Sequence, residues 1–212
     1  MLVIKFFRAL GRQWSLNGPL GLLQVWRIVA NKIYNWLFLS RYHIQADSSC
    51  FISGLKYMQI GSLAMGRYNW LEVVSEYNGQ PTNALLKIGN NVSLSFKNHI
   101  GCAKYVEIGD NCLFGSNVYL TDHNHGWYRG DKQSDANDIV GERDLGCEEV
   151  ILGKNVWVGE NVSILPGSHI GDNAIIGANS VVIGTIPENT IAVGTPAKVV
   201  KVWQDGKWEK VK

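Results

Sequence analysis

The sequence lacks several features that would define whole classes of protein. Its 212 residues contain no run of about 18 apolar residues, so no transmembrane helix is expected, and residues 1–7 lack the pattern of a secretory signal. Charged residues make up only 18%, and the 23 glycines have no three-residue period, which excludes a disordered chain and a collagen. The four cysteines lie far apart without a C-x-x-C pair, which argues against a zinc knuckle or a disulfide framework and favours a reducing cytoplasm.

An internal repeat fills much of the sequence. From residue 152 onward aliphatic residues recur at every sixth position, and small or β-branched residues follow each of them by four positions. The same pattern runs from 88 to 106, slips by two residues, and continues from 108 to 120. The aliphatic members are Leu152, Val158, Ile164, Ile170, Ile176 and Val182, and earlier Ile88, Leu94, Ile100, Val106, Ile108, Phe114 and Leu120.

A period of six fits neither an α-helix nor one long strand. It fits a short strand with two inward positions followed by a turn, and such strands stack coil on coil into a solenoid with a continuous aliphatic column. The two-residue slip at Val106–Ile108 predicts a bulge or a widened corner. Asparagines, which tolerate the left-handed conformation, supply the corners at positions 90, 91, 111, 155, 161 and 173.

This pattern resembles the hexapeptide-repeat acyltransferases over about residues 50–200, and residues 186–200 resemble the end of that family's helix. The resemblance implies an all-β fold, a left-handed parallel β-helix with triangular coils. It is nearest to the galactoside and maltose O-acetyltransferases and to relatives acting on O-antigen, capsule or exopolysaccharide sugars. The implied activity is transfer of acetyl from acetyl-CoA to a sugar hydroxyl in bacterial surface-polysaccharide biosynthesis.

We expect three parts: an N-terminal segment 1–46, a β-helix domain 47–200 with an excursion loop 126–149, and a C-terminal hairpin tail 201–212. In the tail, Asp205-Gly206 suits a two-residue turn that sets Trp203 against Trp208. Residues 1–46 contain six basic and no acidic residues, whereas the remainder has an acidic excess. Because the basic excess is confined to an apolar segment, a nucleic-acid partner is not expected.

The N-terminal segment has helical character on both sides of a break at 16–19. Its second half carries apolar residues at three- and four-residue steps, namely Leu22, Leu23, Trp26, Val29, Ile33, Trp36 and Leu37. A helix here can cap the open end of the solenoid, or residues 1–45 can contact a membrane surface, since tryptophan beside lysine and arginine suits the headgroup region. The expected location is the cytoplasm or the inner face of the membrane.

The position of each histidine in the repeat predicts whether its side chain points into or out of the solenoid. His99 and His169 each precede an inward aliphatic residue, so they point outward, as solvated or subunit-contact histidines do, and His43 precedes the repeat and is expected to be structural. His123 and His125 follow the point where the period stops, and it does not resume for more than twenty residues. Long loops in a compact repeat are commonly functional.

The resemblance implies that His123 is the general base. An imidazole with a pKa near ~6.5 can take the proton of a hydroxyl as its oxygen attacks a thioester carbonyl. Asp122 or Glu160 could fix its tautomer, although either could instead be a solvated turn residue, and His125 is a reserve base or an acceptor contact. The backbone of Gly159-Glu160 corresponds to the donor that stabilises the oxyanion in the family.

The resemblance also implies a homotrimer with acetyl-CoA in a groove between subunits, and no required metal. The positions that correspond to cofactor-binding residues are Trp157, Gly159, Glu160, Ala178, Lys198 and Lys201. The two lysines suit pairing with phosphates, or they belong to an exposed tail. Ile183-Gly184 departs from the polar and basic residues usual near the cofactor.

On the acceptor side, Ser95 and Ala103 replace the acceptor-binding Asn and Asp, so a simple galactoside is not the expected acceptor. The excursion 126–149 is acidic and would repel CoA phosphates, so it either covers the acceptor side or is a solvated flap. A second segment has the composition of sugar-stacking surfaces, or of ordinary packing: Tyr68, Trp70, Glu72, Glu76 and Tyr77.

Two other functions stay open. A γ-class carbonic anhydrase-like metal hydratase has the same β-helix but needs three histidine ligands from adjacent coils, and His99, His123 and His125 do not have that spacing. A non-catalytic trimeric scaffold would use the solenoid only as a platform.

Overall fold

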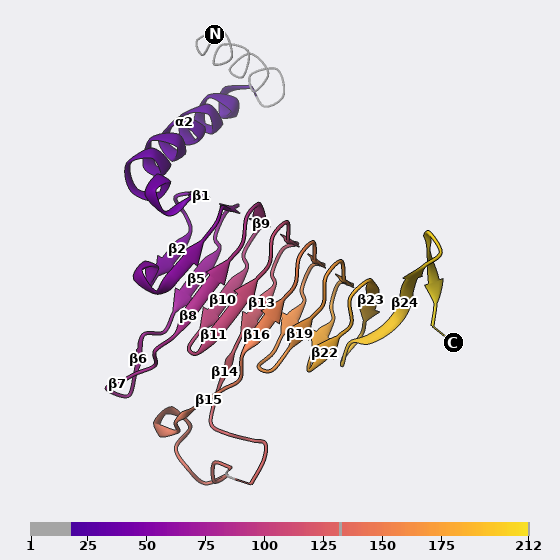
Figure 1. Ribbon diagram of the computed structural model, residues 1–212. Helices are drawn as coiled ribbons and strands as arrows, with labels where there is room; N and C mark the ends of the chain where they lie inside the picture. The colour runs from indigo at the N-terminus through magenta and orange to yellow at the C-terminus, as the bar shows by residue number, and fades with distance from the viewer. Residues whose placement is uncertain (1–17, 132, 212) are drawn as a thin grey trace.

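The protein folds as a three-sided parallel solenoid with a helix at its N-terminal end and a hairpin at its C-terminal end (Figure 1). The computed structural model describes residues 18–131 and 133–211, so the first predicted helical segment lies outside the described residues. The chain visits three sheets in turn, here called faces A, B and C. Strands of successive coils pair in parallel, which confirms the predicted parallel β-helix.

Face A has nine strands, in the order β1 (Ile44–Ala46), β4 (Leu63–Met65), β9 (Val92–Leu94), β12 (Leu113–Phe114), β17 (Trp157–Val158), β20 (Ile175–Ile176), β23 (Thr190–Val193), β24 (Lys198–Gln204) and β25 (Lys207–Lys210). Face B has six, namely β2 (Phe51–Ser53), β5 (Trp70–Val73), β10 (His99–Cys102), β13 (Tyr119–Thr121), β18 (Ser163–Ile164) and β21 (Val181–Val182). Face C has six, namely β22 (Thr185–Ile186), β19 (His169–Ile170), β16 (Val150–Leu152), β11 (Tyr105–Ile108), β8 (Leu85–Ile88) and β3 (Met58–Ile60).

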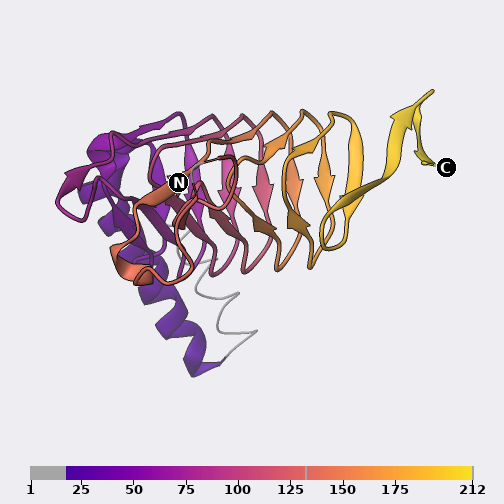
Figure 2. The same ribbon diagram turned by 90° about the horizontal axis from the view of Figure 1, so that it is seen from below.

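Two antiparallel hairpins project from the solenoid, and both lie toward its N-terminal coils (Figures 1 and 2). One pairs β6 (Glu76–Tyr77) with β7 (Gln80–Pro81), and the other pairs β14 (His123–His125) with β15 (Leu145–Cys147). The second hairpin opens into the excursion, which contains the short 3₁₀ helix η4 (Val140–Glu142). A further 3₁₀ turn, η3 (Leu55–Tyr57), precedes β3.

The core is one column of side chains inside the solenoid. All six aliphatic positions of the C-terminal repeat are buried, and so are the six positions that follow them by four residues. Ser168 and Ser180 are the polar members of that second set, and their hydroxyls donate to the carbonyls of Leu165 and Gly177 at 2.6 and 2.7 Å. Because these buried hydroxyls have hydrogen-bond partners, they can be accommodated in the apolar column. The burial of both sets of positions confirms the predicted six-residue period.

The slip in the repeat lengthens one side of a coil. β10 pairs with β5 over four residues without a register shift, and β11 pairs regularly with β8 and β16. The two extra residues therefore lie in the corner at Ala103–Lys104, and these described strands contain no bulge. Of the two predicted outcomes, the altered corner is the one observed.

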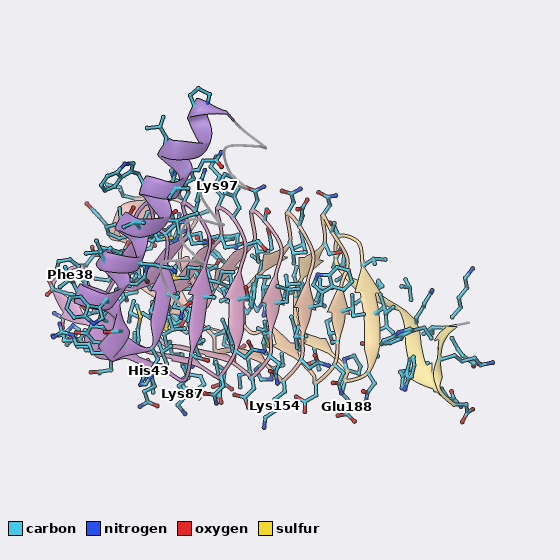
Figure 3. All side chains as sticks on the ribbon, turned by 90° about the horizontal axis from the view of Figure 1, so that it is seen from above. Phe38, His43, Lys87, Lys97, Lys154 and Glu188 are labelled. Atoms are coloured by element: carbon cyan, nitrogen blue, oxygen red, sulfur yellow. The ribbon has the colours of Figure 1, made fainter. Side chains whose placement is uncertain are left out.

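Asparagines turn the corners. Five of the six predicted ones have positive φ, namely Asn91, Asn111, Asn155, Asn161 and Asn173. The prediction is wrong for Asn90, whose N–H donates to the carboxylate of Asp110 at 2.7 Å while its successor makes the turn. Corner residues of successive coils form rows along the solenoid, as Lys154 and Glu188 do (Figure 3).

The N-terminal helix α2 (Pro19–Tyr34) continues through a π-helical turn η1 (Asn35–Leu39) and a 3₁₀ turn η2 (Ser40–Tyr42) into the first coil. It starts where Pro19, which suits the first turn of a helix, follows Gly18. Asp47 connects it to the solenoid, since its carboxylate accepts hydrogen bonds from Arg27 at 2.6 Å and Asn31 at 2.8 Å. No helix in the described ranges is long and apolar enough to cross a membrane.

The C-terminal hairpin forms as predicted. Asp205 and Gly206 both have positive φ, and β24 pairs antiparallel with β25. Trp203 lies opposite Trp208 with ring centroids 5.2 Å apart. Hairpin turns of this kind need two residues that accept positive φ, and Asp-Gly supplies them.

The buried column should dominate stability. Phe114 is completely buried in β12, whereas its neighbour Leu113 points outward with 47% of its surface exposed. We expect Phe114→Ala to lower the free energy of unfolding by about 3–5 kcal/mol, because it leaves a cavity in the column. The matched variant Leu113→Ala should cost less than about 1 kcal/mol. Denaturant titration of both variants measures the difference, and equal losses would contradict this account of the core.

Candidate active site

A corner of the solenoid binds the carboxylate of Asp122. Oδ1 accepts a hydrogen bond from the N–H of Ala103 at 2.8 Å, and Oδ2 accepts bonds from the N–H groups of Lys104 and Tyr105 at 2.7 and 2.8 Å. These donors belong to the corner that the slip of the repeat creates, one coil before Asp122. Because all three are backbone groups, the fold itself sets their positions.

Asp122 is fully buried and nevertheless favours its charged form. Burial alone would raise its pKa, but the hydrogen bonds from His123 and from the N–H groups of Ala103 and Lys104 outweigh burial and hold the pKa below its ordinary value. The alternative of a solvated turn residue is therefore wrong for Asp122. Burial, reinforced by this negative charge, raises the pKa of the neighbouring Cys147 thiol to about 11.

Asp122 orients the imidazole of His123. Its Oδ1 lies 2.9 Å from Nδ1 of His123, and the hydroxyl of Thr121 lies 3.1 Å from the same nitrogen. An ionised carboxylate only accepts hydrogen bonds, so Nδ1 carries the proton and Nε2 carries the lone pair. His123 thus has the tautomer in which the nitrogen away from the carboxylate is basic.

Glu160, the other predicted partner for His123, lies elsewhere. It is exposed at the corner that follows β17 on face A. Among the described residues, its carboxylate makes no hydrogen bond or ion pair with His123. The orienting carboxylate is that of Asp122.

His125 has different surroundings. It is exposed, and its Nδ1 lies 3.0 Å from the hydroxyl of Tyr77 in the other hairpin. The same hydroxyl donates to the carbonyl of Gly141 in the excursion at 3.1 Å. No described carboxylate orients His125, which distinguishes it from His123.

The excursion has internal structure. The guanidinium of Arg143 donates to the hydroxyl of Tyr128 at 2.9 Å and to the carbonyls of Asp135 and Asp138 at 3.0 and 2.9 Å. Arg129 forms an ion pair with Glu148 at 2.8 Å. A hydrogen-bonded loop of this kind is more than a loosely solvated flap, and through Tyr77 it is joined to the hairpin of the N-terminal coils.

The predicted cofactor residues gather along face A and the corner that follows it. Trp157 is exposed on β17, and Gly159 stacks on the next coil so closely that a Cβ there would lie 2.7 Å from the backbone nitrogen of Ala178. The N–H of Gly159 donates to the carbonyl of Ile176, which leaves the N–H of Glu160 as the candidate oxyanion donor. Lys198 and Lys201 belong to β24, which pairs with β23, so they are part of a strand and not of a loose tail.

The two groups of candidates lie at different edges of the solenoid. The chain runs from face A through a corner to face B, and the cofactor candidates lie at or before that corner. Asp122 and His123 follow β13, at the corner between faces B and C. Face B therefore separates them within one protomer.

Sequence reasoning missed His99. It points outward from β10 and is partly exposed, as predicted, but it is not isolated, because its ring stacks on Trp70 with centroids 4.4 Å apart. Its Nε2 is buried without a hydrogen-bond partner among the described residues, and it lies close to His123 above Gly101. The sequence did not indicate that His99 lies near His123, because regular coils of this repeat have eighteen residues. The slip makes this coil twenty residues long, so His99 aligns with Tyr119.

Within one chain, the described residues do not bring together the three ligands that a metal hydratase needs. In the part of the chain that the structure describes, no three His, Cys, Asp or Glu side chains gather as a metal ion would require. His123 is bound to Asp122, and His125 faces Tyr77.

The ionised state of Asp122 predicts how the free energy of unfolding depends on pH. Because the pKa of Asp122 is lowered in the folded protein, its contribution is fully present above the unfolded pKa of about 3.9 and is lost as pH falls through the folded pKa. Asp122→Asn should lower the free energy of unfolding near pH 7 by about 1–3 kcal/mol, because an amide cannot accept all the bonds. Denaturant titrations should find a smaller difference from the wild type at pH 3. A difference that does not change with pH would contradict an ionised Asp122.

Comparison with known proteins gives matches to two family models. Residues 149–184 match the bacterial transferase hexapeptide model (six repeats), and residues 105–121 match the hexapeptide repeat of succinyl-transferase. Both lie on the solenoid, on either side of the excursion.

Curated relatives are acetyltransferases. The chain is 44% identical over 124 residues to a putative lipopolysaccharide biosynthesis O-acetyl transferase of Escherichia coli K12, covering 57% of the chain and 63% of the relative. It is 34% identical over 120 residues to the galactoside O-acetyltransferase of the same organism, covering 57% and 55%. The chain thus spans 63% and 55% of the length of these two relatives.

A maltose O-acetyltransferase structure from Clostridium difficile 630 has the same fold, with a TM-score of 0.52 and 23% identity over 96% of this chain and 89% of that one. The six-residue period, the three parallel sheets and this structural match all indicate a hexapeptide-repeat solenoid. The chain carries hexapeptide repeats over the matched residues, and it is similar in sequence to the lipopolysaccharide and galactoside O-acetyltransferases named above.

Proposed function

We propose that this protein transfers an acetyl group from acetyl-CoA to a hydroxyl of a sugar, with His123 as the general base. The observation that carries the proposal is the pair formed by Asp122 and His123, in which a buried carboxylate 2.9 Å from Nδ1 leaves Nε2 free to accept a proton. The similarity to O-acetyltransferases supports the reaction class.

The chemistry needs one base and one oxyanion donor. Nε2 of His123 takes the hydroxyl proton while the sugar oxygen forms a bond to the thioester carbonyl carbon. The resulting imidazolium is stabilised by the negative charge of Asp122. When the tetrahedral intermediate collapses, the C–S bond breaks and the imidazolium returns the proton to the departing thiolate of CoA. The N–H of Glu160 is the proposed donor to the oxyanion.

The site is proposed to lie between copies of the chain in a homotrimer. His123 and the cofactor candidates Trp157, Ala178, Lys198 and Lys201 occupy different edges of one protomer, which supports a groove completed by a neighbouring subunit. The lysines would pair with CoA phosphates as point charges. The acidic excursion, joined to the hairpin that carries Tyr77, would then border the acceptor.

The proposed role is acetylation of a bacterial surface polysaccharide, supported by the similarity to a lipopolysaccharide biosynthesis protein. Residues Ser95 and Ala103 stand where galactoside enzymes have acceptor-binding Asn and Asp, which argues against a simple galactoside. The expected compartment is the cytoplasm, where acetyl-CoA is made, and the four cysteines are all free thiols, as a reducing compartment would keep them.

Removal of the base tests the reaction. We expect His123→Ala to lower kcat by about 10²–10⁴-fold, because the variant lacks the proposed general base. Release of free CoA thiol from acetyl-CoA, measured with galactosides, maltose and O-antigen oligosaccharides as acceptors, gives the rate. His169→Ala, at an outward histidine of β19, is the matched control and should behave like the wild type.

Two results would change this proposal. Unchanged turnover by His123→Ala would exclude His123 as the base and leave the scaffold role open. Loss of activity only in His125→Ala would assign the base to His125.

A membrane contact through the N-terminal helix is the second part of the proposal. Trp26 and Trp36 are 72% and 73% exposed, and Ile33 and Leu37 beside them are exposed as well. Lys32 is an exposed cation on the same helix. Exposed tryptophans beside cations on a helix suit the headgroup region of an anionic membrane.

The membrane contact is tested with vesicles. Trp26→Gln combined with Trp36→Gln should reduce the fraction of protein that sediments with phosphatidylglycerol–phosphatidylcholine vesicles severalfold, because both indoles leave the interface. Ile139→Gln, at an exposed residue of the excursion, is the control and should bind like the wild type. An unchanged bound fraction with a lower oligomer mass would indicate instead that this face contacts another copy.

A further inference from the structure

His99 is held rigidly on the outside of face B. It lies in register with Trp70 on one neighbouring coil and with Tyr119 on the other. Its ring stacks on Trp70 with an interplanar angle of 16° and lies 5.4 Å from the ring of Tyr119. Aromatic neighbours on both sides fix the plane of the imidazole, so its nitrogens have defined directions.

One nitrogen of this fixed ring has no hydrogen-bond partner among the described residues. Nε2 of His99 is buried without a hydrogen bond from any described residue, and the nearest carboxylate oxygen, Oε2 of Glu72, is 3.9 Å away. Burial lowers the pKa of His99, the charge of Glu72 opposes this, and His123 adds to the lowering. The ring is therefore uncharged near neutral pH, and the hydrogen-bonding capacity of Nε2 is unused among the described residues.

The unpartnered nitrogen faces the base. A Cβ at Gly101 would lie 3.7 Å from Nε2 of His99 and 3.4 Å from Cε1 of His123. The two imidazoles thus border the same small space, which exists because residue 101 has no side chain. The nearest carboxylates differ in position: Asp122 lies at Nδ1 of His123, whereas Glu72 lies 3.9 Å from Nε2 of His99.

A sugar hydroxyl fits this arrangement chemically. A neutral imidazole nitrogen makes one hydrogen bond with a hydroxyl, as donor or as acceptor. Hydroxyls on neighbouring carbons of a sugar ring are the groups that could reach two imidazoles at once. Trp70, partly covered by His99 and 43% exposed, adds an apolar surface beside them.

We propose that His99 is an acceptor-binding residue, whose Nε2 hydrogen-bonds the hydroxyl next to the one that His123 deprotonates. The acceptor is then a sugar with two neighbouring hydroxyls, of which one is acetylated and the other selects the substrate. This inference rests on the proposed function, and it adds a residue and a substrate requirement to it.

The variant His99→Phe tests the nitrogen separately from the ring. Phenylalanine keeps the stacking on Trp70 but has no polar atom, so we expect the KM for the acceptor to rise about tenfold, while kcat and the KM for acetyl-CoA change little. His99→Gln, whose amide nitrogen reaches a similar position, should restore part of the affinity. His169→Phe is the matched control at another outward histidine.

Substrate variants test the same contact from the other side. The acceptor is the best one found among galactosides, maltose and O-antigen oligosaccharides, compared with its deoxy analogue that lacks the hydroxyl next to the acetylated one. For the wild type, the KM of the analogue should be about tenfold higher than that of the acceptor. For His99→Phe, the two KM values should be equal. Gly101→Ala, which places a methyl group at ordinary contact distance in the shared space, should also raise the acceptor KM. Thermal melting of each variant verifies folding.

The outcomes separate the two proposals. If the wild type acetylates none of the sugars, the proposed function is overturned and this inference falls with it. If the wild type is active and His99→Phe has the wild-type KM and the same preference against the deoxy analogue, His99 only packs the face and this inference alone is overturned. A raised acceptor KM together with a lost preference supports it.

Discussion

The proposed site depends on a buried carboxylate whose charge is stabilised by backbone N–H groups. Asp122 lies in the solenoid wall, where burial without partners would neutralise it, and the corner after β10 supplies three N–H donors. This ionised group in turn fixes the tautomer of His123. If the corner were of ordinary length, the donors would be displaced, and neither the charge nor the orientation of the imidazole would be secured.

Regularity and its interruption have separate roles in this fold. The regular coils form a continuous aliphatic core, so stability is spread along the solenoid and a local departure is tolerated. The departures are a lengthened coil side and the excursion after β14. Both occur on two adjacent coils, around the two imidazoles of His99 and His123. The chemically versatile side chains are thus placed where the repeat is broken, on a scaffold that does not depend on them.

The two ends of the solenoid, which lie far apart along the coil axis, carry different proposed roles. The helix α2 extends from the first coil with Trp26 and Ile33 exposed, whereas β24 and its two candidate phosphate-binding lysines close the last coil (Figure 1). A protomer that contacts a membrane at one end and binds a soluble co-substrate along face A would present the acceptor side, between them, to a lipid-linked or polymeric sugar. This arrangement is consistent with the acidic excursion lying near the N-terminal coils.

The sequence by itself determined the solenoid, its inward positions, most of its corners, the C-terminal hairpin and the loop that contains His123. These follow from a six-residue period and from residues with a narrow range of backbone conformations, such as Asn155 and Gly206, so they are local properties. The tertiary structure alone decided which carboxylate orients His123 and which second histidine lies beside it. Asp122 meets donors from one coil earlier, and His99 reaches His123 across a twenty-residue coil. Contacts between coils depend on register, and register is set by the slip, which the spacing of residues allowed to be either a bulge or an altered corner.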